Sequence, residues 1–205
     1  MNLKTAPASG FLLSAEAQKK LPVMAVAQLA ALQAEKMLPA HEIKSLVALL
    51  PGKARGGEMM RSDLEKWLWG TPQTPGVLTP FLETGATFYL GDRVYYLPTT
   101  QDVCDAWAAS DLGKLIWTPQ RFDCDDFAFA FKGHCSRVAY FRGDWKLCGF
   151  CLGFVSGLFG WAPGRHAAAL FVTYDQGVTE VKFLEPADGT LHTLAECTKI
   201  YALFI

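Results

Sequence analysis

The chain has 205 residues and a formal net charge of −1 at pH 7, and its composition is 51% hydrophobic and 13% aromatic. This length fits one large domain, or a domain with a helical appendage, and the apolar content excludes disorder over most of it. The near-zero charge argues against a broad phosphate-binding surface, so no nucleic-acid partner is expected.

Residues 1–75 are predicted to form a helical N-terminal subdomain or arm. Prolines and glycines over 70–80 predict a linker, which separates this arm from a second domain, residues 76–205. Apolar periodicity and capping signals predict three helices in the arm, over 14–37, 41–50 and 62–69.

In the second domain the sequence pattern changes from one typical of helices to one that includes β-strands. A hairpin is predicted over 87–97, with Gly91-Asp92 at its turn. Two helices follow, one over 100–109 and a long aromatic one over 124–140. The order of elements predicts an α+β fold, in which N-terminal helices and a catalytic helix pack against an antiparallel β-sheet. Its later strands are expected at about 146–155, 165–174, 178–185 and 197–205.

Two stretches bear on the compartment of the protein. Residues Met1–Thr5 lack the apolar core and cleavage site of a signal peptide. The glycine-rich apolar run 147–163 predicts a buried hairpin rather than a membrane helix. Six cysteines without a signal are typical of reduced thiols. We therefore expect a cytoplasmic protein without a membrane partner, although non-classical export or association with a virion stays open.

Cys124 lies in an acidic motif, Asp123-Cys124-Asp125-Asp126, at the predicted start of a helix. The free backbone N–H groups of a first turn favour a thiolate, whereas the three carboxylates raise the pKa of the thiol. A Ca²⁺ ion bound by Asp123, Asp125 and Asp126 would resolve this conflict, because clustered carboxylates suit a hard cation. Without a metal, the same acids complement the helix dipole, and Cys124 could be a buried, inert side chain.

His166 and Glu185 lie on consecutive predicted strands downstream of Cys124. His166 could accept the thiol proton, and Glu185 could orient the imidazole, since adjacent antiparallel strands bring such side chains into contact. Cysteine, histidine and acid in this order are the parts of a papain-like nucleophile. Other acids could take the last role, namely Asp175, Glu180 and Asp188.

The oxyanion donor is expected just before the nucleophile. Gln120 is the preferred side chain, together with the backbone N–H of Cys124, and Thr118 is a second candidate. Two other cysteines, Cys148 and Cys151, have the spacing of a redox motif but fall within a predicted strand, where residues three apart face opposite sides. Core packing is favoured for them over redox chemistry or zinc binding with His134 and Cys135.

Three segments carry a resemblance to a known family: Phe122–Ala128, Gly164–Ala167 and Leu184–Pro186. Together they resemble the papain-like C-terminal domain of the fungal Marasmius oreades agglutinin, which has short relatives in bacteria and phages. The resemblance spans roughly residues 85–190 and does not include the helical arm. It implies a papain-like fold and a calcium-dependent cysteine protease.

By this resemblance, Cys124 is the nucleophile, His166 the base and Glu185 the orienting acid. The implied metal positions are those of the acidic motif, the implied substrate is a protein or peptide, and no organic cofactor is expected. Two departures stand against an optimised protease: alanines follow His166 where an amide is expected, and Ala187 stands where a glutamine is expected.

These departures keep a second reading open, a catalytically degenerate papain-like scaffold that acts as a structural or interaction protein. Within the enzyme class, a transglutaminase or deamidase would use the same three residues. The sequence also leaves a homo-oligomer open.

Overall fold

The computed structural model describes residues 56–141 and 148–205. The helices expected over 14–37 and 41–50 lie outside these residues. None of the helices in the described part of the chain is long and apolar enough to cross a lipid bilayer.

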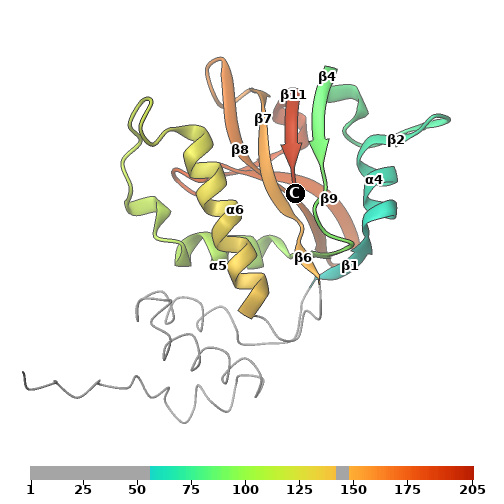
Figure 1. Ribbon diagram of the computed structural model, residues 1–205, viewed down its shortest axis with the longest axis horizontal. Helices are drawn as coiled ribbons and strands as arrows, with labels where there is room; N and C mark the ends of the chain where they lie inside the picture. The colour runs from blue at the N-terminus through green and yellow to red at the C-terminus, as the bar shows by residue number, and fades with distance from the viewer. Residues whose placement is uncertain (1–55, 142–147) are drawn as a thin grey trace, which may run out of the picture.

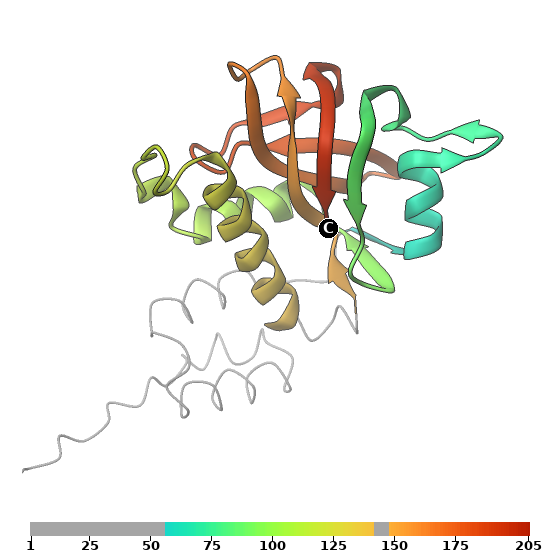
Figure 2. The ribbon, with the colours of Figure 1, turned by 45° about the horizontal axis from the view of Figure 1, so that its top comes forward.

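A curled six-stranded sheet forms the centre of the molecule (Figure 1, Figure 2). All neighbouring strands are antiparallel except the last pair, which is parallel, so the sheet is mixed rather than purely antiparallel as expected. In spatial order the strands are β10 (Leu191–Thr193), β9 (Val178–Leu184), β8 (Arg165–Asp175), β7 (Leu152–Phe159), β11 (Cys197–Phe204) and β4 (Leu82–Tyr89).

The long helix α6 (Cys124–Phe141) lies across β7 and β8 (Figure 1). Its aromatic side chains Phe127 and Phe131 are fully buried in a core that also contains Phe150 and Phe171. Burial of such large apolar groups is the main force that holds the helix on the sheet. The predicted helix over 124–140 is therefore confirmed, and its first turn stands at one end of β8.

Helix α5 (Thr100–Ala109) packs against α6 and begins with a capping box. The Thr99 hydroxyl accepts from the Asp102 N–H at 3.1 Å, and the Asp102 carboxylate accepts from the Thr99 N–H at 3.0 Å. Such a box satisfies two of the free donors of a first turn. The helix predicted over 100–109 is confirmed, as is the one predicted over 62–69, which is α4 (Arg61–Trp69).

The predicted hairpin over 87–97 is wrong. Strand β5 (Val94–Leu97) does not pair with β4 but forms a separate three-stranded sheet with β1 (Gly57–Met60) and β6 (Gly149–Phe150). The physical reason lies in its burial: Tyr95 and Tyr96 are neighbours that point to opposite faces of β5, and both are buried. Such a strand needs partners on both edges and cover on both faces, which one arm of a surface hairpin lacks.

The stretch 70–80 was expected to be a linker, but it is ordered and packed. It contains the short strands β2 (Gly70–Thr71) and β3 (Thr74–Pro75) and the 3₁₀ turn η1 (Thr79–Phe81). Leu78 is fully buried in the same core as Leu64 and Leu68 of α4 and the central strands. The proposed boundary between residues 75 and 76 stays a prediction, because most of the N-terminal part lies outside the described residues.

Candidate active site

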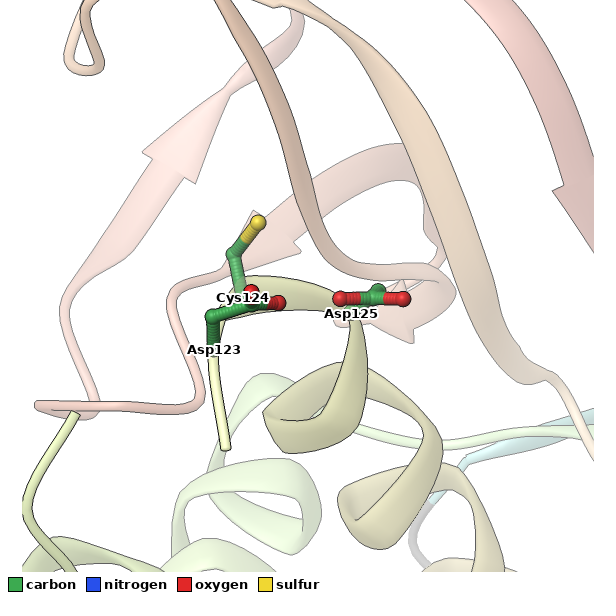
Figure 3. Close-up of side chains that lie close together, drawn as sticks. All are labelled: Asp123, Cys124 and Asp125. Atoms are coloured by element: carbon green, nitrogen blue, oxygen red, sulfur yellow. The ribbon is translucent and has the colours of Figure 1, made fainter. Parts of the chain in front are cut away.

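Cys124, the candidate nucleophile, is the first residue of α6. The carboxylate of Asp123 accepts from the Gln120 N–H at 3.1 Å, and the Asp123 N–H donates to Asp126 Oδ2 at 3.2 Å. These hydrogen bonds fix the turn that enters the helix and so fix the position of the thiol. Figure 3 shows the sulfur of Cys124 directed away from the carboxylates of Asp123 and Asp125.

The thiol is half-buried against strand β8, where Cys124 packs on Ala128 and Ala167. Burial raises the pKa of the Cys124 thiol, and the charges of Asp123 and Asp125 raise it further. A hydrogen bond from the Ala167 N–H acts in the opposite direction. The raised pKa favours the thiol over the thiolate, so a nearby base would assist deprotonation of Cys124.

His166 and Glu185 form a hydrogen-bonded pair. His166 lies near the start of β8, and Glu185 directly follows the antiparallel strand β9. Nε2 of His166 and Oε2 of Glu185 are 2.5 Å apart, and the two side chains are 19% and 12% exposed. Since Nε2 is engaged with the carboxylate, Nδ1 is the ring nitrogen left to accept a proton.

The turn after β9 holds the Glu185 carboxylate in place. Its Oε1 accepts from the backbone N–H of Ala187 at 3.2 Å, and the Trp107 indole of α5 donates to the carbonyl of Pro186 at 2.9 Å. Gly189, with φ of 80°, closes the turn by donating to the carbonyl of Glu185 at 2.7 Å. The alanine at position 187 thus contributes a hydrogen bond through its backbone, for which its side chain is irrelevant.

The competing acids have other partners. Asp175 accepts from the N–H and the hydroxyl of Thr100, and Glu180 pairs with Lys182 at 3.3 Å. Asp188 accepts from the backbone N–H of Thr190 at 2.8 Å. Glu185 is therefore the carboxylate that the fold places on His166.

Cys124, His166 and Glu185 line one pocket of about 460 Å³. The sequence predicted these three residues, but it missed the walls, which come from loops, from the start of β8 and from the short strand β10. The sequence feature that could have indicated these wall residues is the presence of aromatic and charged side chains in predicted loops and turns. The remaining wall residues are Trp117, Trp161, Ala162, Pro163, Arg165, Asp188, Thr190 and His192.

Gln120, the predicted oxyanion donor, is exposed and does not line this pocket. Its backbone has φ of 62°, in the left-handed region, within a tight turn that the paired backbones of Thr118 and Phe122 close at 2.9 Å in both directions. Thr118 does not line the pocket either. The geometry brings neither side chain to the thiol, and an oxyanion role for Gln120 stays a prediction.

The acidic motif forms a compact group of donors at the start of α6. Ligand atoms of Asp123, Cys124 and Asp125 lie within 4.8 Å of one another. A hydrogen bond between the two carboxyls lowers the pKa of Asp123 and raises the pKa of Asp125, so the pair is close enough to share a proton. Two such oxygen donors fit a hard cation in place of that proton, whereas a thiol does not suit Ca²⁺. Asp126 is not part of this group and serves the helix start.

All six cysteines lie in the described part of the chain, and none of them forms a disulfide there. Cys135 and Cys151 are fully buried, and burial raises the pKa of both thiols, that of Cys151 to about 12. Such thiols behave as core side chains, in line with the packing role expected for them.

Comparisons with known proteins give a family match and two similar solved structures. Residues 95–191 match the family model described as agglutinin C-terminal. A solved structure, the PSL1a–E64 complex, is similar with a TM-score of 0.60 and 28% identity, over 72% of this chain and 51% of that one. The fold is papain-like, as in PSL1a.

A second similar structure is the Polyporus squamosus lectin bound to the human-type influenza-binding epitope Neu5Acα2-6Galβ1-4GlcNAc. Its TM-score is 0.55 and its identity 27%, over 72% of this chain and 49% of that one. The chain thus spans about half the length of these two structures. No curated protein matches the chain.

Proposed function

We propose that residues 95–191, the segment that matches the agglutinin C-terminal family, carry the active site of a cysteine peptidase. The observation that supports this most strongly is the shared pocket, in which Cys124 lies with a histidine whose second nitrogen is already held by a buried carboxylate. A thiol, an imidazole and a carboxylate that line one pocket are the groups that a thiol–imidazole nucleophile uses.

In this proposal Nδ1 of His166 takes the proton of Cys124, and the thiolate attacks the carbonyl carbon of a peptide bond. Glu185 keeps the proton of the neutral imidazole on Nε2 and stabilises the imidazolium that forms. The imidazolium then protonates the leaving amine, which departs and leaves a thioester on Cys124. Water, deprotonated by His166, hydrolyses this thioester and restores the free thiol.

The complex of PSL1a with E64 supports the same assignment. E64 is an epoxide, and a thiolate opens such a ring to form a stable thioether. A relative with 28% identity over most of this chain therefore binds a compound suited to an activated thiol. We expect Cys124 to react in the same way.

Calcium dependence is a further part of the proposal. Asp123 and Asp125 would hold the ion with their paired carboxylates, and Asp126, also expected as a ligand, would have to leave the helix cap to join them. A bound Ca²⁺ would supply positive charge that offsets the two carboxylates beside the nucleophile.

A degenerate scaffold is the alternative, and the burial that raises the pKa of the Cys124 thiol favours it. A transglutaminase or a deamidase would share the acylation step. In a transglutaminase an amine attacks the thioester, whereas in a deamidase water attacks it and the amide that is opened belongs to a side chain.

Labelling of the intact chain by E64 tests the proposal, with and without Ca²⁺, on the unmodified protein and on Cys124→Ala. We expect one adduct that requires Cys124 and forms faster with Ca²⁺, while the half-buried Cys104 and Cys148 serve as internal controls for unspecific reaction. A rate that ignores Ca²⁺ would remove the metal from the proposal. No adduct under either condition, on a folded chain, would favour the scaffold.

A further inference from the structure

Three consecutive apolar side chains are exposed beside the pocket. Leu115 is 48% exposed, Ile116 83% and Trp117 52%. Proteins rarely expose several large apolar side chains side by side, and such a patch usually marks an interaction site or a ligand-binding groove. We call this segment, residues 115–117, the apolar lip.

The apolar lip is held in place by hydrogen bonds at both ends. The Leu115 N–H donates to the carbonyl of Leu112 at 2.9 Å. At the other end the hydroxyl of Thr118 donates to the carbonyl of Ile116 at 3.2 Å, and Thr118 pairs with Phe122 two residues before the nucleophile. The exposed side chains are therefore presented by a defined turn that continues into α6.

The apolar lip is also continuous with the pocket, since Trp117 is one of its wall residues. Another apolar turn stands in the wall, formed by Trp161, Ala162 and Pro163 between β7 and β8. The indole of Trp161 is locked by stacking on Phe159 and on His192, with ring centroids 4.5 and 4.0 Å away. The thiol of Cys124 thus lies in a pocket with apolar groups from two separate loops.

We propose that the apolar lip binds bulky apolar side chains of an extended polypeptide substrate, next to the amide that Cys124 attacks. The inference rests on the proposed peptidase function and names its substrate class. The occupant is a polypeptide because Trp117, the last residue of the apolar lip, shares the pocket wall with Cys124, so a chain whose amide reaches the thiol passes beside the lip. Covering one side chain of this size changes an equilibrium constant about tenfold or more.

The test uses two short fluorescent peptides that differ only in carrying leucine or serine on either side of a central amide. Binding is measured by fluorescence anisotropy on Cys124→Ala, with and without Ile116→Ser. Because Ile116 is 83% exposed, its replacement should leave the fold intact. Val178→Ser is the matched control, since Val178 is an exposed β-branched residue at the start of β9, 55% exposed and absent from the pocket wall.

We expect Ile116→Ser to weaken binding of the leucine peptide about tenfold and to leave binding of the serine peptide unchanged. In the chain that keeps Cys124, the same substitution should raise KM for the leucine peptide and leave kcat unchanged. Val178→Ser should change neither peptide. Alkylation of Cys124 by iodoacetamide, which is too small to reach the lip, should proceed at the same rate in all variants.

Equal binding of the two peptides, or no effect of Ile116→Ser on folded protein, overturns the inference even if the peptides are cleaved. A lower molecular mass of Ile116→Ser in solution, with unchanged peptide affinity, also overturns it and assigns the lip to a contact between copies of the chain. Selective binding of the leucine peptide through Ile116 without any cleavage supports the docking surface and refutes the peptidase.

Discussion

Replacement of Glu185 by glutamine tests the arrangement of the proposed triad most directly. Glutamine keeps the size of the side chain, so the buried turn after β9 should stay intact. Its amide oxygen can still accept from the Ala187 N–H, but its NH₂ group then faces Nε2 of His166. Nε2 must accept that hydrogen bond, and the ring proton moves to Nδ1, the nitrogen that has to take the proton of Cys124.

The expected loss follows from the charged hydrogen bond between the Glu185 carboxylate and the His166 imidazolium, which the NH₂ group of a glutamine cannot make. A hydrogen bond to a charged group that is 12% exposed contributes about 1.5–3 kcal/mol. At about 1.4 kcal/mol per factor of ten, Glu185→Gln should lower kcat/KM by about 10- to 150-fold. The wrong tautomer of His166 adds to this, so the figure is a lower bound.

The assay is kcat/KM on a cleaved peptide, together with the rate of labelling of Cys124 by E64. Glu180→Gln is the matched control, because Glu180 lies on β9 itself but is exposed and pairs with Lys182. Both variants should unfold at the temperature of the unmodified chain. If Glu185→Gln stays within about threefold of Glu180→Gln in both assays, the role given to Glu185 is wrong.

Two further predictions concern stability against pH. Burial raises the pKa of Asp175, but the hydrogen bonds from Thr100 outweigh it, and the pKa of this carboxyl lies below its ordinary value. The ionised Asp175 carboxylate therefore stabilises the folded chain at pH above its unfolded pKa near 4, and this stabilisation is lost as the pH falls through its folded pKa. Asp175→Asn should lower the free energy of unfolding at pH 7 by about 1 kcal/mol in urea titrations, and it should reduce the dependence of that free energy on pH in the acid range. Burial raises the pKa of Tyr95 to about 12, so stability should fall as the pH rises from about 10 to about 12. Tyr95→Phe should remove that slope, and an unchanged slope would show that another group titrates there.

The sequence indicates the three candidate site residues more directly than the strand pairing around them. Cys124, His166 and Glu185 each have a local signal, a helix start or a strand followed by a turn, and the spacing between them fits one sheet edge. Local patterns are enough for such residues because β8 and β9 are consecutive along the chain and paired in space, and α6 packs on β8.

The wrong predictions concern residues that meet in space but lie far apart along the chain. The edge strand β4 pairs with β11, and their partners Leu82 and Ile200 are about 120 residues apart, so no local pattern could separate this pairing from a hairpin. The pocket walls were missed for a related reason. Trp117 comes from a loop and His192 from the short edge strand β10, and the positions of both depend on tertiary contacts that periodicity does not report.

The place of β11 between β7 and β4 also has a consequence for how the chain folds. Before residues 197–204 join the sheet, the hydrophobic strand β7 has an open edge, and β4 has no strand partner among the described residues. Open apolar edges pair with other chains, so a partly synthesised or partly unfolded molecule is most prone to aggregate at this stage. A single strand, β11, thus covers the open edges of both β7 and β4.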